Sequence, residues 1–173
     1  MEINYEEQAK QLIQEIYPYV CDCNDPEDYQ EAIGYFNLQN HTHICFKYGS
    51  TRVVFITNNY VIKIDCGRPH DLRDFGTCAK EVAMYARARK DGFDYLFAKI
   101  TRYFYKHMNF YIMPLINDVG TAEENADYYM DDIEYTWIME QHLFDLHSMN
   151  FGWKNGHVCL IDYAAYDDDD EEE

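Results

Sequence analysis

Apolar residues near the start of the chain recur at close to helical spacing, at Ala9, Leu12, Ile13, Ile16 and Tyr17. Asn4 followed by Glu7 is typical of a helix N-cap with its capping-box partner, and we expect the helix to begin there. Pro18 is expected to end it. Residues 21–31 are rich in Asp, Asn and Pro, which predicts a loop or a short turn of helix.

The pattern then changes to three short β-prone runs, at residues 44–48, 52–56 and 60–64. They are separated by Gly-Ser-Thr at 49–51 and Thr-Asn-Asn at 57–59, which predicts an antiparallel meander. A polar connection at 66–76 follows. Residues 77–90 are predicted to be helical, with one side formed by Val82, Tyr85, Ala86 and Arg89.

Two more strand-like runs follow at residues 99–105 and 109–113, with a turn at 106–108 and Pro114 ending the second. Residues 118–125 are polar and predict a loop. Residues 126–142 predict a helix, whose candidate core residues are Tyr129, Ile133, Trp137 and Ile138. The last ordered piece is expected to be a loop and a short hairpin that leads to Asp162. No linker rich in Gly, Ser or Pro divides the chain.

Composition limits the partners that the chain can have. The 173 residues suffice for one domain, and the net charge is −18, of which residues 167–173 supply seven and leave −11 for the rest. Such a charge disfavours direct binding to nucleic-acid phosphates and suits basic partners. The acidic run is expected to be a solvated, disordered tail, which either keeps the protein in solution or attracts a basic protein.

Six cysteines lie at irregular spacings, at Cys21, Cys23, Cys45, Cys66, Cys78 and Cys159. The N-terminus has no apolar run typical of a signal peptide, and no apolar stretch is long enough to span a membrane. We therefore expect a cytoplasmic protein with free thiols and no membrane partner.

Three polar residues near the end of the chain carry the candidate chemistry. Asp145 is followed by Asn150 five residues later, and Asp162 comes directly after an apolar run. Phosphoryl transfer needs one carboxylate to orient the attacking hydroxyl, and an amide oxygen and a second carboxylate to hold Mg²⁺ against the phosphates of ATP. These three residues fit those roles in that order.

At these residues the sequence resembles the protein-kinase superfamily. Asp-Leu-His-Ser-Met-Asn at 145–150 resembles the catalytic loop, and Ile-Asp-Tyr-Ala at 161–164 resembles the metal-binding motif written Asp-Phe-Gly. Many protein kinases have Lys at the position of His147, and a histidine there is similar to the aminoglycoside-phosphotransferase branch of the superfamily. Lys63, in the third run of the meander, stands where the family has its phosphate-binding lysine. Glu81, 18 residues on, stands where the family has the glutamate that pairs with that lysine.

The resemblance implies further nucleotide contacts. Gly49, Ser50 and Thr51 would correspond to the glycine-rich loop, although a plain β-turn explains them equally well. Met113 and Leu115, at the end of the fifth strand, would form the hinge that binds adenine through its backbone.

The implied fold is α+β and kinase-like. A five-stranded antiparallel sheet and a helix would form a small lobe over residues 44–116, and residues 117–166 a truncated large lobe, since no Ala-Pro-Glu-like segment follows Asp162. Residues 1–43 would be a helical extension of this single domain, and 167–173 its tail. The resemblance covers residues 44–163 and extends to small kinase-like proteins of bacteriophages.

The leading hypothesis is an ATP- and Mg²⁺-dependent phosphotransferase acting on a protein or small-molecule hydroxyl. Asp145, Lys63 and Glu81 would be its catalytic residues, and Asn150 and Asp162 its metal ligands. The alternative is a weak or inactive pseudokinase that binds and inhibits a host protein. A third interpretation is an acidic mimic of nucleic acid.

A metal site of another kind stays open. Cys21, Cys23, His41 and His43 could supply four zinc ligands, although their spacing matches no common zinc finger.

Overall fold

The computed structural model describes residues 4–67, 77–116, 129–143 and 145–165. Across these residues the chain is a mixed α+β protein with four α-helices, a five-stranded antiparallel sheet and a separate two-stranded sheet. The chain forms two compact units. Unit 1 comprises Met1–Cys78 and Ile100–Leu115, and unit 2 comprises Ala79–Lys99 and Ile116–Glu173.

Helix α1, Tyr5–Val20, opens unit 1. The predicted N-cap is confirmed, because the Asn4 side chain accepts a hydrogen bond from the Glu7 N–H at 3.3 Å. The prediction that Pro18 ends the helix is wrong, since the helix continues through it to Val20. A proline in the last turn removes only its own N–H bond, and the added turn buries Val20 completely.

Helix α2, Pro26–Asn40, begins inside the segment predicted to be a loop or a short turn of helix, and it is much longer than that prediction allowed. The Asp25 side chain caps the helix by accepting the Asp28 N–H at 3.0 Å. Pro26 takes the first helical position, where its fixed φ is favourable and its missing N–H costs nothing. The buried residues on the inner side of α2 are Tyr29, Ile33 and Phe36, which are spaced four and then three residues apart, as expected for one side of a helix.

The five-stranded sheet confirms the predicted meander and the two later strands. Its order is β1-β2-β3-β5-β4, and all neighbouring strands are antiparallel. The strands are β1 Cys45–Tyr48, β2 Arg52–Ile56, β3 Tyr60–Asp65, β4 Thr101–Tyr105 and β5 Met108–Pro114. As predicted, Pro114 is the last residue of β5.

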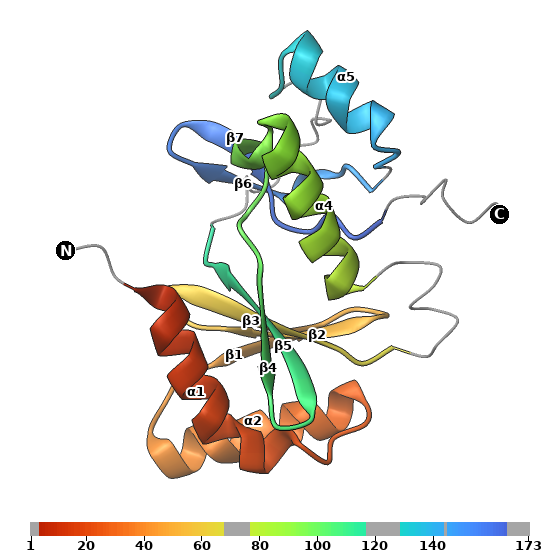
Figure 1. Ribbon diagram of the computed structural model, residues 1–173. Coiled ribbons are helices and arrows are strands. Elements are labelled where there is room, and N and C mark those ends of the chain that lie inside the picture. The colour runs from red at the N-terminus through yellow and green to blue at the C-terminus, as the bar shows by residue number, and fades with distance from the viewer. Residues whose placement is uncertain (1–3, 68–76, 117–128, 144, 166–173) are drawn as a thin grey trace, which may run out of the picture. The chain divides into compact units, whose positions relative to one another are not determined.

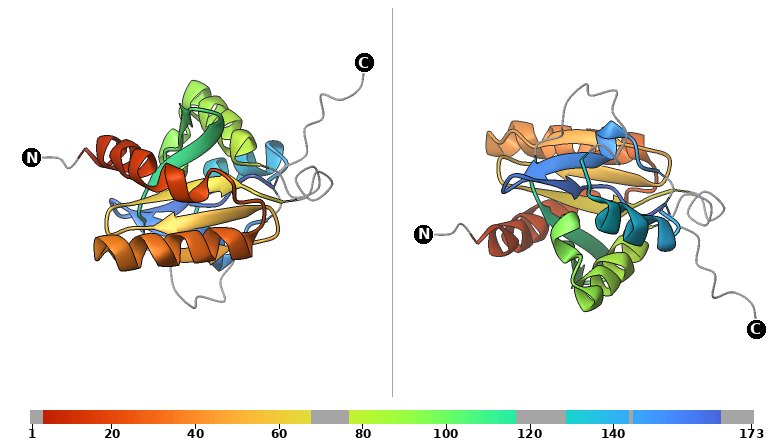
Figure 2. Two further views of the ribbon diagram at one scale, coloured as in Figure 1. Left: turned by 90° about the horizontal axis from the view of Figure 1, so that it is seen from below. Right: turned by 90° about the horizontal axis from the view of Figure 1, so that it is seen from above.

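The two N-terminal helices cover one face of this sheet (Figure 1; Figure 2, left). Helix α1 packs on β3, β4 and β5, and α2 packs on β1 and β2. The core between them includes Val53, Phe55, Ile62, Ile64, Phe110 and Ile112. Because side chains alternate along a strand, Lys63 and its cross-strand neighbours Val54 and Tyr111 belong to the opposite face.

The helix predicted at residues 77–90 is confirmed as α4, Cys78–Asp91. All of it but Cys78 belongs to unit 2. Its buried side carries Glu81, Met84 and Ala88. Of the four residues predicted to share one side of this helix, Val82 and Tyr85 are partly buried, whereas Ala86 and Arg89 are exposed. The 3-10 turn η1, Asp94–Leu96, follows this helix.

The second helix of unit 2 is α5, Asp132–Glu140, which begins later than predicted. Asp131 and Glu134 form a reciprocal capping box there, which fixes the start of the helix. Trp137 and Ile138 are buried as expected. The core assignment of Ile133 is wrong, since its side chain is 70% exposed.

The predicted hairpin near the C-terminus is confirmed. It comprises β6, Phe151–Lys154, and β7, His157–Leu160, and follows the 3-10 turn η3, Ser148–Asn150. The turn residues Asn155 and Gly156 both have positive φ, at 55° and 85°. Asn-Gly tolerates this conformation, which matches the twist of the two strands.

Other sequence expectations lie outside the described residues. These are most of the connection at 66–76, the loop at 118–125 and the tail at 167–173. All six cysteines are free thiols. No helix in the described ranges has the length and apolar character needed to cross a membrane.

The junction between α2 and β1 depends on Asn37. Its Nδ2 donates to the Ile44 carbonyl at 2.9 Å, and its Oδ1 accepts the Ile44 N–H at 3.0 Å and the Thr42 hydroxyl at 2.8 Å. We predict that Asn37→Ala lowers the free energy of unfolding by about 1–3 kcal/mol, because partly buried polar groups lose their partner. Urea denaturation measures this, with the exposed Gln39→Ala as control. Equal midpoints for both variants would contradict the assignment.

Candidate functional site

The loop between Asp145 and Asn150 is closed by a hydrogen bond across it. Asn150 Nδ2 donates to the Asp145 carbonyl oxygen at 2.8 Å. Asn150 is 7% exposed, whereas the Asp145 side chain is 51% exposed. The loop therefore presents one carboxylate to solvent and keeps one amide fixed beneath it.

His147 lies between these two side chains. Its Nε2 is 3.3 Å from Asp145 Oδ1 and 3.3 Å from Asn150 Nδ2. A ring nitrogen that carries a proton donates to the carboxylate, and one without a proton accepts from the amide, so the two bonds exclude each other. The Nε2 atom of His147 can therefore hold only one of these two neighbours at a time.

The main chain of Asn150 joins the loop to the end of β7. The Ile161 N–H donates to the Asn150 carbonyl oxygen at 2.8 Å, which extends the pairing of Phe151 with Leu160 by one residue. Asp162 is the next residue after this bond. The hairpin β6–β7 therefore brings the end of the loop and the start of the Asp162 segment together.

Tyr163 anchors the segment on the other side of Asp162. Its N–H donates to Glu81 Oε1 on α4 at 3.2 Å, and its hydroxyl donates to the Ala98 carbonyl at 2.7 Å. Its ring meets the Phe97 ring edge-on, with centroids 4.9 Å apart. Burial, and then the nearby Glu81 carboxylate, raise the pKa of Tyr163 well above its ordinary value, so the hydroxyl stays protonated as a donor.

The structure thus connects four of the five predicted key residues within unit 2. Hydrogen bonds join the Asp145 carbonyl to Asn150 and the Asn150 carbonyl to Ile161, the residue before Asp162, and Tyr163, the residue after it, bonds Glu81. Tyr163 and Ala98 were not singled out as functional from the sequence. An aromatic residue after the second acid was the available signal for Tyr163, whereas nothing in the sequence indicates the backbone carbonyl of Ala98.

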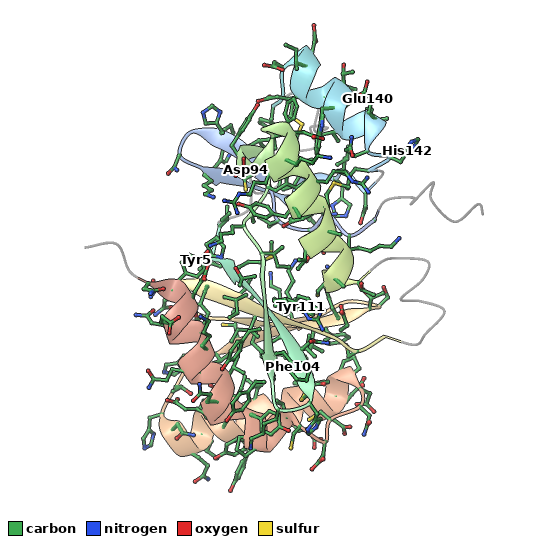
Figure 3. The ribbon with its side chains drawn as sticks, in the orientation of Figure 1. Tyr5, Asp94, Phe104, Tyr111, Glu140 and His142 are labelled. Carbon is green, nitrogen blue, oxygen red and sulfur yellow. The ribbon has the colours of Figure 1, made fainter. Side chains whose placement is uncertain are left out.

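Lys63 belongs to unit 1 and is 4% exposed on the central strand β3. It is in register with Val54 on one side and, on the other, with Tyr111, which is labelled in Figure 3. Its pairing with Glu81 stays a prediction, because Glu81 belongs to unit 2.

The predicted glycine-rich loop forms the tight turn between β1 and β2. The Gly49 N–H donates to the Arg52 carbonyl at 3.0 Å, and Ser50 is exposed. The Thr51 side chain is buried, and its carbonyl accepts the N–H groups of Cys66 and Gly67. Of the three predicted contacts, Gly49 and Ser50 are therefore the accessible ones.

The predicted hinge lies at the end of β5. Met113 pairs with Val61 of β3 and is buried. The Leu115 N–H donates to the Asn59 carbonyl at 2.9 Å, so this amide is engaged within unit 1. A contact between Leu115 and adenine would therefore use its carbonyl oxygen.

The alternative zinc site is not assembled. Among the described residues, which include Cys21, Cys23, His41 and His43, no three His, Cys, Asp or Glu side chains cluster as metal ligands. Burial raises the pKa of the Cys23 thiol to about 11, which disfavours the thiolate that zinc requires.

No protein-family model and no curated protein matches the sequence. The candidate site therefore rests on its own geometry.

The anchor at Tyr163 can be tested directly. We predict that Tyr163→Phe lowers the free energy of unfolding by about 1–2 kcal/mol, because the hydroxyl bond to the buried Ala98 carbonyl is lost while the ring stays. Urea denaturation followed by tryptophan fluorescence provides the measurement. Tyr95→Phe is the control, since Tyr95 is 43% exposed and its hydroxyl bonds Glu134 at the surface. A larger loss in the control would contradict the assignment.

Proposed function

We propose that this chain is a kinase-like protein that binds ATP with Mg²⁺ and transfers the γ-phosphoryl group to a hydroxyl. The observation that carries the proposal is a pair of hydrogen bonds within one unit: the Asn150 side chain bonds the Asp145 carbonyl, and the Asn150 carbonyl bonds the N–H of Ile161, the residue before Asp162. Phosphoryl transfer depends mainly on positioning and on stabilising negative charge, and these bonds fix the main chain at or beside all three residues.

The two proposed metal ligands suit Mg²⁺, which prefers oxygen donors. Asn150 uses its Nδ2 to close the loop, so its Oδ1 is turned away from that bond. Among the described residues no hydrogen bond to this Oδ1 is found, so it is the atom of Asn150 that would meet a metal ion. Asp162 is half-buried and would supply a carboxylate. Mg²⁺ held by both would neutralise charge on the phosphates.

Asp145 would orient the attacking hydroxyl and accept its proton. Its carboxylate is half-exposed, as a group that meets an external substrate must be, and His147 lies within reach of it. Glu81 would keep the Asp162 segment in position through the Tyr163 N–H. Lys63 would bind the α- and β-phosphates, as the resemblance to kinases implies.

Transfer of labelled phosphate from [γ-³²P]ATP in the presence of Mg²⁺ tests the proposal, with and without added cell lysate as a source of acceptor. Asp162→Asn and Asp145→Ala are each expected to lower transfer about 100-fold or more, because one loses a metal ligand and the other the hydroxyl-orienting carboxylate. Asp132→Asn, which changes an exposed acid of unit 2, is the matched control and should transfer normally. Wild-type transfer by Asp162→Asn would refute the proposal.

A second candidate is a nucleotide-binding protein that acts by binding another protein. Exposed apolar side chains on α2, Tyr35 and Leu38, favour it. Stabilisation of the wild type by ATP and Mg²⁺ without any labelled product would support this candidate over the enzyme.

A further inference from the structure

The outer face of α2 carries acidic and apolar side chains that are exposed in the described part of the chain. Tyr29, Ile33 and Phe36 turn inward to the sheet. At 100° per residue, the opposite side carries the positions Glu27, Glu31, Gly34, Tyr35 and Leu38, which we call the α2 outer face. All five are exposed.

The apolar half of this face is prominent. Leu38 is 71% exposed and Tyr35 is 56% exposed, and the two lie three residues apart on neighbouring turns. Tyr19, at the end of α1, places its ring 6.0 Å from the Tyr35 ring and extends the apolar surface. Single exposed apolar residues are ordinary, but neighbouring ones on one helix form a surface that another apolar side chain can bury.

Gly34 lies in the middle of this face. A Cβ atom added there would meet no atom within 4 Å, and its φ is not positive, so neither packing nor backbone conformation within the chain requires glycine. An exposed glycine inside a helix costs about 0.5–1 kcal/mol relative to alanine. Its absent side chain leaves a flat position beside Tyr35 and Leu38, where a second backbone can approach closely.

Charge identifies the kind of partner. Residues 11–46, which include residues 11–20 of α1 and all of α2, contain six acidic residues and no Lys or Arg. Glu27 and Asp28 complement the N-terminus of α2, but Glu31 lies beyond its first turn, and Glu15 and Asp22 lie outside the helix. A second copy of the chain would bring acidic surfaces together, and an anionic membrane or nucleic acid would be repelled.

We propose that the α2 outer face binds a cationic amphipathic helix of another protein. Lys or Arg side chains of that helix would lie against Glu27 and Glu31, and its apolar residues would pack on Tyr35 and Leu38 across Gly34. The inference does not depend on the nucleotide site, because every residue that it uses belongs to unit 1 and none has a proposed role in phosphoryl transfer.

The test uses the full chain and a fluorescein-labelled synthetic peptide of Leu and Lys with helical amphipathic spacing, and fluorescence anisotropy as readout. Binding is expected to weaken with salt and to exceed that of a scrambled peptide of the same composition. Leu38→Ser is expected to raise Kd about tenfold, a loss typical of a central apolar contact. Ile133→Ser is the matched control, because Ile133 is equally exposed and also lies among acids on α5.

Gly34→Gln separates binding from folding. Glutamine is a better helix former than glycine, so this variant should unfold at the same or a higher temperature. It should nevertheless weaken peptide binding about tenfold, because its side chain fills the flat position. Three results would overturn the inference: equal weakening by Leu38→Ser and Ile133→Ser, unchanged binding by Gly34→Gln, or a dimer in analytical ultracentrifugation that Leu38→Ser abolishes. It would also be overturned if the chain bound anionic lipid vesicles and did not bind the peptide.

Discussion

Asn150 joins two segments of unit 2 through two hydrogen bonds, one made by its side chain and one by its main chain. Its side-chain amide holds the Asp145 carbonyl, and its own carbonyl holds the Ile161 N–H. The hairpin β6–β7 supplies the register that makes the second bond possible. Because one residue makes both bonds, the main chain at Asp145 and the main chain just before Asp162 are held by a common residue. The chemistry that we propose depends on that shared support.

The same region is held from the other side by Glu81 and Tyr163. A buried carboxylate that accepts a backbone N–H fixes the main chain without requiring a particular side chain at Tyr163. The Tyr163 hydroxyl then adds a bond to the Ala98 carbonyl, and the Ala98 N–H donates to the Leu160 carbonyl at the end of β7. Asp162 thus lies between two residues whose main chains are both hydrogen-bonded, Ile161 and Tyr163.

The sequence predicted helices and strands correctly where one hydrophobic periodicity dominated. The prediction failed where the local composition was typical of a loop but the segment folds as a helix. The strands from Ile44 to Pro114 and the hairpin before Asp162 follow directly from alternating apolar residues and turn residues. Helix α2 was missed because Asp25 and Pro26, which indicate a loop by composition, here serve as N-cap and first residue. Asp145, Asn150 and Asp162 could be named from their spacing. The carbonyls of Asp145 and Ala98 that hold the site could not, since backbone acceptors carry no sequence signal.

The central claim is that Asn150 and Asp162 hold a divalent cation together with ATP. Paramagnetic broadening of backbone amide signals by Mn²⁺ with ATP, measured by NMR on the full chain, locates such a cation directly. We expect the amides of Asn150, Ile161 and Tyr163 to be the first to broaden in unit 2, and Asp162→Asn to abolish the effect. Broadening confined to other acidic segments, such as residues 22–31, with these three amides unchanged, would contradict it.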